Sequence, residues 1–204
     1  METRYAVIIG INDYDNHPLN FCVNDAKSIK EALIAKANFL EENIYSITSE
    51  IDNPLKNITG KLNEAILKIK TAFHEENDSL FFYFAGHGYQ ENYESYLMFH
   101  DSGYKISDIC KGFNELRPKM QFYVIDACES GNKTLTRSVS YEKENYLNEL
   151  LKYSSGILYL YACQADQAAL ENESIKHGVM THHFIEAIQN IKLVTVKTST
   201  SCKK

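Results

Sequence analysis

Several features that would place a chain in a familiar class are missing from this sequence. No apolar run approaches the roughly 18 residues that a membrane-spanning helix needs. The N-terminus has no apolar stretch of the kind found in secretory signal peptides. The chain also lacks the G-x-G-x-x-G and Walker A patterns of nucleotide-binding proteins. These absences predict a cytoplasmic protein that makes no contact with a membrane and has no such nucleotide-binding loop.

The cysteines do not form a pattern typical of disulfides or of metal binding. There are five, an odd number, and no two have the C-x-x-C spacing of a zinc or redox site. One reactive thiol among inert ones fits an intracellular chain better than a disulfide framework does. His182 and His183 have only Glu186 as a partner one turn away, so no metal site is predicted there.

Charge and length are those of a single soluble domain. The 204 residues suffice for one domain with a sizeable hydrophobic core. The net charge of −6 argues against a nucleic-acid partner, because such proteins usually present a basic surface.

Apolar runs and segments with helical spacing alternate along the chain. Strands are expected at residues 5–9, 43–48, 80–85, 121–127 and 156–162. Helices are expected at residues 24–37 and 59–73, from Ser107 to just before Pro118, and at 181–190. This order predicts an α/β fold with a mostly parallel central sheet and helices on both faces. Residues 95–100 are expected to form a short hairpin arm.

Two chemically active side chains follow two of these predicted strands. His87 stands between two glycines after the 80–85 run, and Cys128 directly follows the 121–127 run. Because the carboxyl ends of parallel strands meet at one edge of a sheet, we expect the two residues to be neighbours. An imidazole can take the thiol proton and later give it to a leaving amine. The N–H groups of Gly88 and Cys128 are candidate donors to the developing oxyanion.

Each of these features has an ordinary explanation when it is taken alone. A cysteine after a strand is usually buried and inert, and Gly-His-Gly is usually a turn. Cys128 could also be a redox sensor if Cys163 acted as the resolving thiol. The pair at matching strand ends favours a cysteine endopeptidase. The alternative is a catalytically silent scaffold of the same fold that regulates a partner.

Four segments resemble the caspase-like cysteine peptidases, and they are most similar to metacaspases and bacterial caspase-family proteases. They contain His87, Cys128, Asp25 and Cys163, and they follow the family's order in residues 7–26, 82–88, 123–131 and 162–181. The resemblance covers residues 4–190. It implies a caspase-like three-layer sandwich and a Cys128–His87 dyad without a required third member. The implied peptidase domain is 1–190, followed by a short strand or tail at 191–204.

The resemblance also implies a substrate preference. Metacaspases cleave after arginine or lysine and use two acids in the pocket, which at the matching positions are Asp25 and Asp126. A carboxylate pair suits a guanidinium or an ammonium group when solvent is excluded. Cys163 is expected to line the substrate groove through its backbone. Two simpler explanations stay open: Asp25 could cap a helix, and Asp126 could brace the loop after its strand.

No resident cofactor is expected, and calcium activation is the open question. Calcium activates many metacaspases through acidic residues. Asp13, Asp15, Asp101 and Asp108 are candidate loop carboxylates here, but they lack the spacing of an EF-hand. Protein substrates with basic residues before the cleaved bond are the expected partners, together with a regulatory domain or partner protein.

Overall fold

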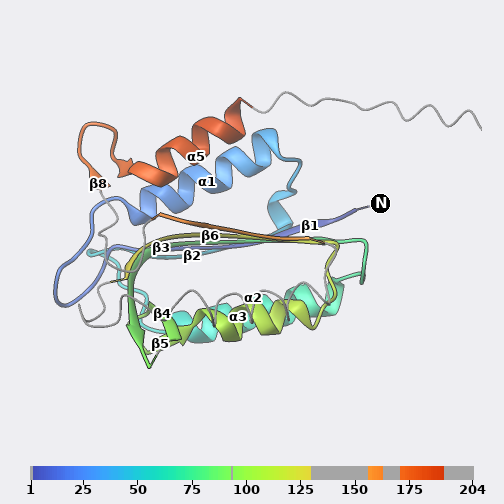
Figure 1. Cartoon of the computed structure of the whole chain (residues 1–204). Helices are drawn as coiled ribbons and strands as arrows, with labels where there is room; N and C mark the ends of the chain where they lie inside the picture. Colours follow the sequence, from blue (N-terminus) through green and yellow to red (C-terminus); the bar gives the residue numbers. More distant parts are fainter. Residues whose placement is uncertain (1, 93, 130–155, 163–170, 191–204) are drawn as a thin grey trace, which may run out of the picture.

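The computed structural model describes residues 2–92, 94–129, 156–162 and 171–190 (Figure 1). The side chains of Cys128 and Glu129, and the whole of Cys163, lie outside this described part. The tail predicted at 191–204 lies outside it as well. No helix in the described ranges combines the length and the apolar character needed to cross a membrane.

The central sheet is mostly parallel, as the sequence predicts. Its strands are β1 (Arg4–Ile11), β2 (Ile44–Ser49), β3 (Ser79–Glu91), β4 (Glu94–Met98), β5 (Gly103–Lys105), β6 (Met120–Glu129) and β7 (Ile157–Tyr161). Five of them are parallel neighbours in the order β2-β1-β3-β6-β7. The other two, β4 and β5, extend antiparallel from the second half of β3 and form the expected arm.

Helices cover both faces of this sheet, which confirms the expected three-layer sandwich. They are α1 (Cys22–Lys36), α2 (Ile58–Ala72), α3 (Ile106–Asn114) and α5 (Val179–Gln189), with a short 3₁₀ helix η1 (Glu41–Asn43). In Figure 1, α1 and α5 lie on one side of the sheet, and α2 and α3 lie on the other. A two-stranded hairpin of β8 (Glu171–Asn172) and β9 (His177–Gly178) precedes α5.

The strand β3 contributes side chains to both hydrophobic cores. Leu80, Phe82 and Phe84 pack in the core under α2 and α3. Their neighbours Phe81, Tyr83 and Ala85 pack in the core under α1 and α5. This alternation is the reason why a continuous apolar run marks a central strand that is covered on both faces.

The pair His87 and Cys128 lies within strands, whereas the sequence places it just past the strand ends. β1 pairs with β3 only as far as Ala85, and β4 then pairs with Gly88–Glu91. β6 pairs with β3 from Ser79 through Gly88 and ends at Glu129. The hydrogen-bonded ladder therefore continues after the apolar run stops, so both strands extend beyond the ends that hydrophobicity alone predicts.

Helix starts differ from the predicted ones by a residue or two. α1 begins at Cys22 with Phe21 at its N-cap, and α3 begins at Ile106 with Lys105 at its N-cap. Ser107 is therefore inside the first turn of its helix and does not cap it. The elements β5, β8 and β9 have two or three residues each, too few to produce a periodic pattern.

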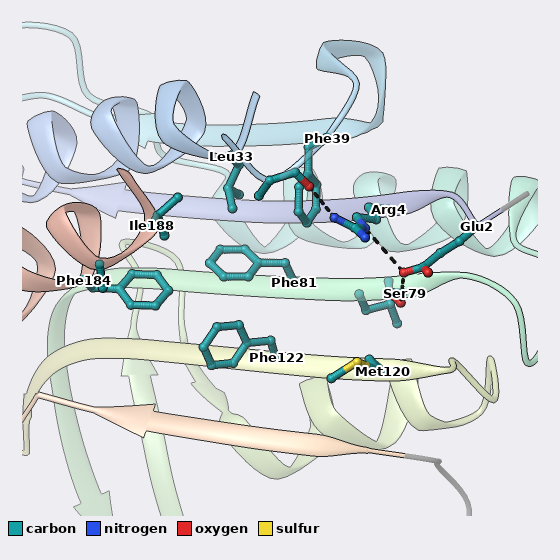
Figure 2. A pocket seen from close by; sticks show the side chains of 13 residues that line it. Glu2, Arg4, Leu33, Phe39, Ser79, Phe81, Met120, Phe122, Phe184 and Ile188 are labelled. Carbon is teal, nitrogen blue, oxygen red and sulfur yellow. Dashed lines mark hydrogen bonds and ion pairs between the residues drawn. The ribbon is translucent and has the colours of Figure 1, made fainter. Parts of the chain in front are cut away.

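A cavity of about 330 Å³ lies between α1, α5 and the first residues of β1, β3 and β6 (Figure 2). Arg4 and Glu2 form an ion pair of 3.4 Å at one side of it. The apolar lining includes Leu33, Phe81, Phe122 and Phe184. This cavity lies near the N-terminal ends of the strands, so it is separate from the edge of the sheet that carries His87.

Candidate active site

His87 and Cys128 are paired neighbours on adjacent strands. The register between β3 and β6 runs from Ser79 with Met120 to Gly88 with Glu129, and within it His87 pairs with Cys128. Neighbouring strands are about 4.8 Å apart. The structure thus brings together two residues that are 41 positions apart in the chain. The long parallel register between two central strands fixes their backbones relative to one another.

The imidazole of His87 is oriented by a backbone carbonyl. Its Nε2 atom lies 2.7 Å from the carbonyl oxygen of His17. His17 adopts a left-handed conformation with φ of 63° in the loop between β1 and α1. Asn12 holds that loop, because its side chain donates to the carbonyl of Asn20 and accepts from the N–H of Val23, both at 3.1 Å. The sequence does not mark His17 as a third member, since any residue can supply a carbonyl.

Tyr14 holds the backbone of His87. Its hydroxyl accepts the N–H of His87 at 2.9 Å and donates to the carbonyl of Met98 at 3.1 Å. The two rings are 4.5 Å apart between centroids. Burial raises the pKa of Tyr14, so the hydroxyl stays protonated. Gly86 is needed beside it, because a Cβ there would overlap the Tyr14 oxygen. No motif in the sequence marks Tyr14 for this role.

Gly88 is a buried strand residue and not part of a turn. Its register partners are Leu97 in β4 and Glu129 in β6. It follows His87 directly, so its backbone lies beside the pair. Its role as an oxyanion donor, and that of the Cys128 N–H, stay predictions.

The two acids predicted for the substrate pocket lie close together and are buried. Asp25 is 2% exposed and Asp126 is 6% exposed. Both border Gly178, where an added Cβ would lie 2.5 Å from Oδ2 of Asp126 and 3.2 Å from Oδ2 of Asp25. Asp25 lies in the first turn of α1, whose N-cap is Phe21, so it is not the helix cap considered above.

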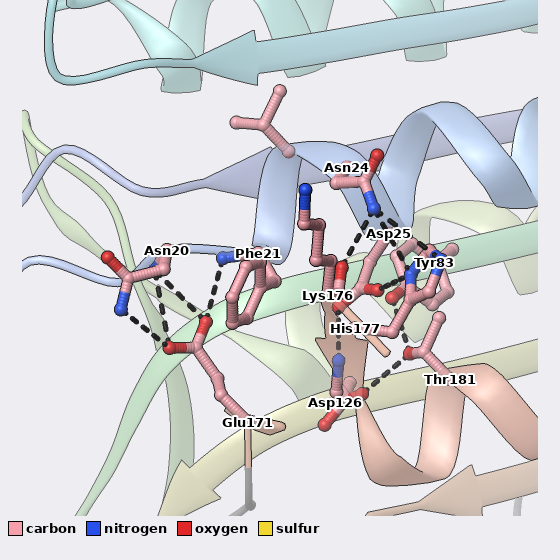
Figure 3. Close-up of polar contacts among 12 residues, drawn as sticks. Asn20, Phe21, Asn24, Asp25, Tyr83, Asp126, Glu171, Lys176, His177 and Thr181 are labelled. Atoms are coloured by element: carbon pink, nitrogen blue, oxygen red, sulfur yellow. Dashed lines mark hydrogen bonds and ion pairs between the residues drawn. The ribbon is translucent and has the colours of Figure 1, made fainter. Parts of the chain in front are cut away.

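Each acid has partners in β9 or in the first turn of α5 (Figure 3). Asp25 accepts the N–H of Gly178 at 3.0 Å, and its Oδ1 atom lies 2.5 Å from Nδ1 of His177. Asp126 accepts the hydroxyl of Thr181 at 2.6 Å. Thr181 in turn is 2.7 Å from the hydroxyl of Tyr83. The sequence marks none of these three partners as a contact of the acids, because they lie more than 50 positions away along the chain.

Burial dominates the electrostatics of this pocket. Burial, together with the nearby charges of Asp126 and Glu171 and against the hydrogen bond from Gly178, raises the pKa of Asp25 to about 8. Burial also raises the pKa of Asp126, against the hydrogen bonds from Thr181, and it lowers the pKa of His177. These shifts favour a hydrogen bond between the neutral forms of Asp25 and His177 over an ion pair. Desolvation favours the neutral form of both partners.

Metal ligands are sparse in the part of the chain that the structure describes. There the one group of three potential ligands is His182, His183 and Glu186 on α5, with donor atoms within 4.8 Å of one another. His183 and Glu186 are exposed, and the ion pair between them measures 3.0 Å. This group lies on the surface of one helix.

Two of the four carboxylates considered for calcium have other partners. Asp13 pairs with Lys56 at 3.4 Å, and Asp101 accepts the N–H of Thr59 at 3.1 Å. Within the described residues, Asp13, Asp15, Asp101 and Asp108 do not form a group of three ligands. A calcium requirement stays a prediction.

Comparison with known proteins gives the family. Residues 3–199 match the caspase domain. Metacaspase-1 of Arabidopsis thaliana is 28% identical over 91% of this chain and 59% of its own length. Metacaspase-1 of Eremothecium gossypii is 31% identical over 63% of this chain and 32% of its own length. The paracaspase of Dictyostelium discoideum is 25% identical over 96% of this chain and 46% of its own length.

The chain thus spans about half the length, or less, of these curated relatives. The match to the caspase domain nevertheless covers nearly all of this chain, and it includes the strands that carry His87 and Cys128. The chain belongs to the caspase-domain family of cysteine peptidases, on the metacaspase side of that family.

Proposed function

We propose that this chain is a cysteine endopeptidase in which Cys128 is the nucleophile and His87 is the general base. The observation that carries the proposal is the register of β3 with β6, which pairs the two residues directly. A thiol becomes an effective nucleophile only when it is deprotonated, and a neighbouring imidazole is the usual base for that step.

The contact with His17 suggests which nitrogen of His87 acts. A carbonyl oxygen accepts hydrogen bonds only, so Nε2 carries the proton that it donates across the 2.7 Å to His17. Nδ1 then has the lone pair that takes the thiol proton. The carbonyl of His17 thereby does what an acidic third member does in other triads: it fixes the tautomer and orients the ring.

The reaction follows from these roles. The Cys128 thiolate attacks the scissile carbonyl carbon, and the oxyanion accepts hydrogen bonds from the N–H groups of Gly88 and Cys128. The protonated His87 gives its Nδ1 proton to the leaving amine, and the C–N bond breaks. His87 then takes a proton from water, and the resulting hydroxide attacks the thioester carbonyl carbon. The C–S bond breaks, His87 returns its proton to the departing thiolate, and the carboxylic acid and the free thiol are released.

We infer a preference for arginine or lysine before the cleaved bond. Asp25 and Asp126 are two buried carboxyl groups that border the same glycine, Gly178. A cation that enters such a site shifts both carboxyls toward their ionised forms and gains charge-assisted hydrogen bonds. An acidic side chain would meet two acids and would be rejected.

Peptide cleavage tests the proposal. Fluorogenic peptides with arginine, lysine or aspartate before the cleaved bond are assayed with wild type and with Cys128→Ala, with and without calcium. The expected result is turnover of the arginine and lysine peptides by wild type and its loss in Cys128→Ala. Cys202→Ala is the matched thiol control and should retain activity. Activity that survives Cys128→Ala would overturn the mechanism, and turnover of the aspartate peptide alone would overturn the specificity. Inactivity towards every peptide under all conditions would instead favour a silent scaffold.

A further inference from the structure

The β8–β9 hairpin is tied to the start of α1 at both of its strands (Figure 3). From β8, the carboxylate of Glu171 accepts the backbone N–H of Asn20 at 3.1 Å and that of Phe21 at 2.9 Å. From the turn before β9, the carbonyl of Lys176 accepts the side-chain amide of Asn24 at 2.8 Å. These bonds bring the hairpin against the helix turn that carries Asp25.

His177 is the residue that this hairpin places on Asp25. Its Nδ1 atom lies 2.5 Å from Oδ1 of Asp25, and the N–H of Gly178 donates to Oδ2 of Asp25 at 3.0 Å. The side chain of His177 is 17% exposed, whereas that of Asp25 is 3% exposed. The imidazole is therefore within reach of solvent, and the carboxyl behind it is not.

We propose that His177 is a specificity-determining residue that competes with the substrate for Asp25. Its imidazole holds the carboxyl oxygen that an incoming guanidinium or ammonium group needs, and a basic side chain must displace it to bind. This inference rests on the pocket assigned under the proposed function, and it adds a built-in competitor to that pocket.

Displacement of the imidazole selects for cations. A neutral side chain that removes the hydrogen bond between His177 and Asp25 offers at best another neutral bond in return. A cation replaces it with a charge-assisted bond, which is roughly twice as strong. A competitor that only a cation can displace therefore raises specificity while it weakens binding, which is how repulsive or competing elements commonly work.

The experiment compares His177→Ala with His177→Asn. The asparagine keeps a hydrogen-bonding amide where Nδ1 stands, whereas alanine removes the competitor. For arginine and lysine peptides we expect His177→Ala to lower KM about threefold to tenfold, the worth of one net hydrogen bond. His177→Asn should restore the higher KM. His183→Ala, which removes an exposed imidazole from α5, is the matched control and should retain the wild-type KM.

The direction of the effect separates competition from a structural role. If His177 only supported the hairpin, its loss would loosen the pocket and raise KM. An unchanged or raised KM in His177→Ala would therefore overturn the inference.

Direct binding of benzamidine, an amidinium probe, separates this inference from the proposed function. Calorimetry on the Cys128→Ala background gives its dissociation constant with and without His177→Ala. If no variant cleaves a basic peptide, the proposed function fails, but tighter benzamidine binding in His177→Ala would still support competition at Asp25. Equal dissociation constants, or no binding to either protein, would overturn the competition itself.

Discussion

The hydroxyl of Tyr14 bridges His87 to Met98, with 2.9 Å to the N–H of His87 and 3.1 Å to the carbonyl of Met98. Tyr14 follows β1, His87 lies in β3 and Met98 ends β4, so one side chain connects three parts of the sheet edge. It lies where β3 changes its partner from β1 to β4. We infer that Tyr14 positions His87 without touching substrate.

Tyr14→Phe is expected to reduce kcat more than it raises KM. The substitution keeps the ring against His87 but leaves the N–H of His87 and the carbonyl of Met98 without this partner. The free energy of unfolding should fall by about 1–3 kcal/mol. Steady-state kinetics and urea unfolding measure the two effects. Tyr45→Phe, on the edge strand β2, is the matched control and should change neither. A Tyr14→Phe enzyme with wild-type kcat would contradict the positioning role.

Gly178→Ala tests how closely the carboxyl groups of Asp25 and Asp126 approach the backbone of Gly178. The new Cβ would lie 2.5 Å from Oδ2 of Asp126, too close for a real contact, so the acids must move apart. We expect a higher KM for basic peptides and a lower melting temperature. Gly112→Ala in α3 is the control, because a Cβ there meets nothing within 4 Å. That helical substitution should stabilise the protein by about 0.5–1 kcal/mol. Equal behaviour of the two variants would argue against the close approach.

Asp25→Asn should change how stability depends on pH. The pKa of Asp25 is about 8 in the folded protein, against an ordinary value of 3.8. Between these values the folded state holds a proton that the unfolded state releases. This contribution to stability is complete below pH 3.8 and is lost as the pH rises towards 8. Asparagine has no such titration, so the variant should lose less stability between pH 5 and pH 8.

Urea unfolding at several pH values measures this difference. Asp52→Asn, at an exposed position after β2, is the control and should follow the wild-type curve. Parallel curves for wild type and Asp25→Asn would contradict the raised pKa of Asp25. The same ionisation should strengthen benzamidine binding to wild type as the pH rises towards 8, because a cation binds the charged carboxylate better.

Thr181 links Asp126 to Tyr83, and its hydroxyl can be removed with little change in shape. In Thr181→Val, the carboxyl of Asp126 loses a donor at 2.6 Å and the hydroxyl of Tyr83 loses its contact at 2.7 Å. All three residues are buried, so about 1–3 kcal/mol of stability should be lost. The pKa of Asp126 should rise further, and KM for basic peptides should rise with it. Thr181→Ser keeps the hydroxyl and should restore most of both properties. A Thr181→Val variant with the wild-type KM would show that Thr181 does not contribute to substrate binding in the pocket.

Local sequence patterns were sufficient for the layers of this fold. The apolar run at 80–85 alternates into two cores, as its length and composition predict, and the helices at α1 and α2 begin within two residues of their predicted starts. The proximity of His87 and Cys128 was also predictable, because parallel strands align their carboxyl ends. The exact strand ends were not predictable, since β4 pairs with residues 88–91 of β3, which have no continuous apolar pattern.

The orientation of His87 and the partners of Asp25 were decided by tertiary structure. His17 acts through a carbonyl that every residue possesses, so no residue type marks it in the sequence. His177 is 152 positions from Asp25, and a two-stranded hairpin too short to show periodicity brings them together. The longer strands and helices, together with His87 and Cys128, follow from local composition and spacing. The contacts of His87 and Asp25 depend instead on tertiary packing. The loop between β1 and α1 places the His17 carbonyl on His87, and the β8–β9 hairpin packs against α1 and places His177 on Asp25.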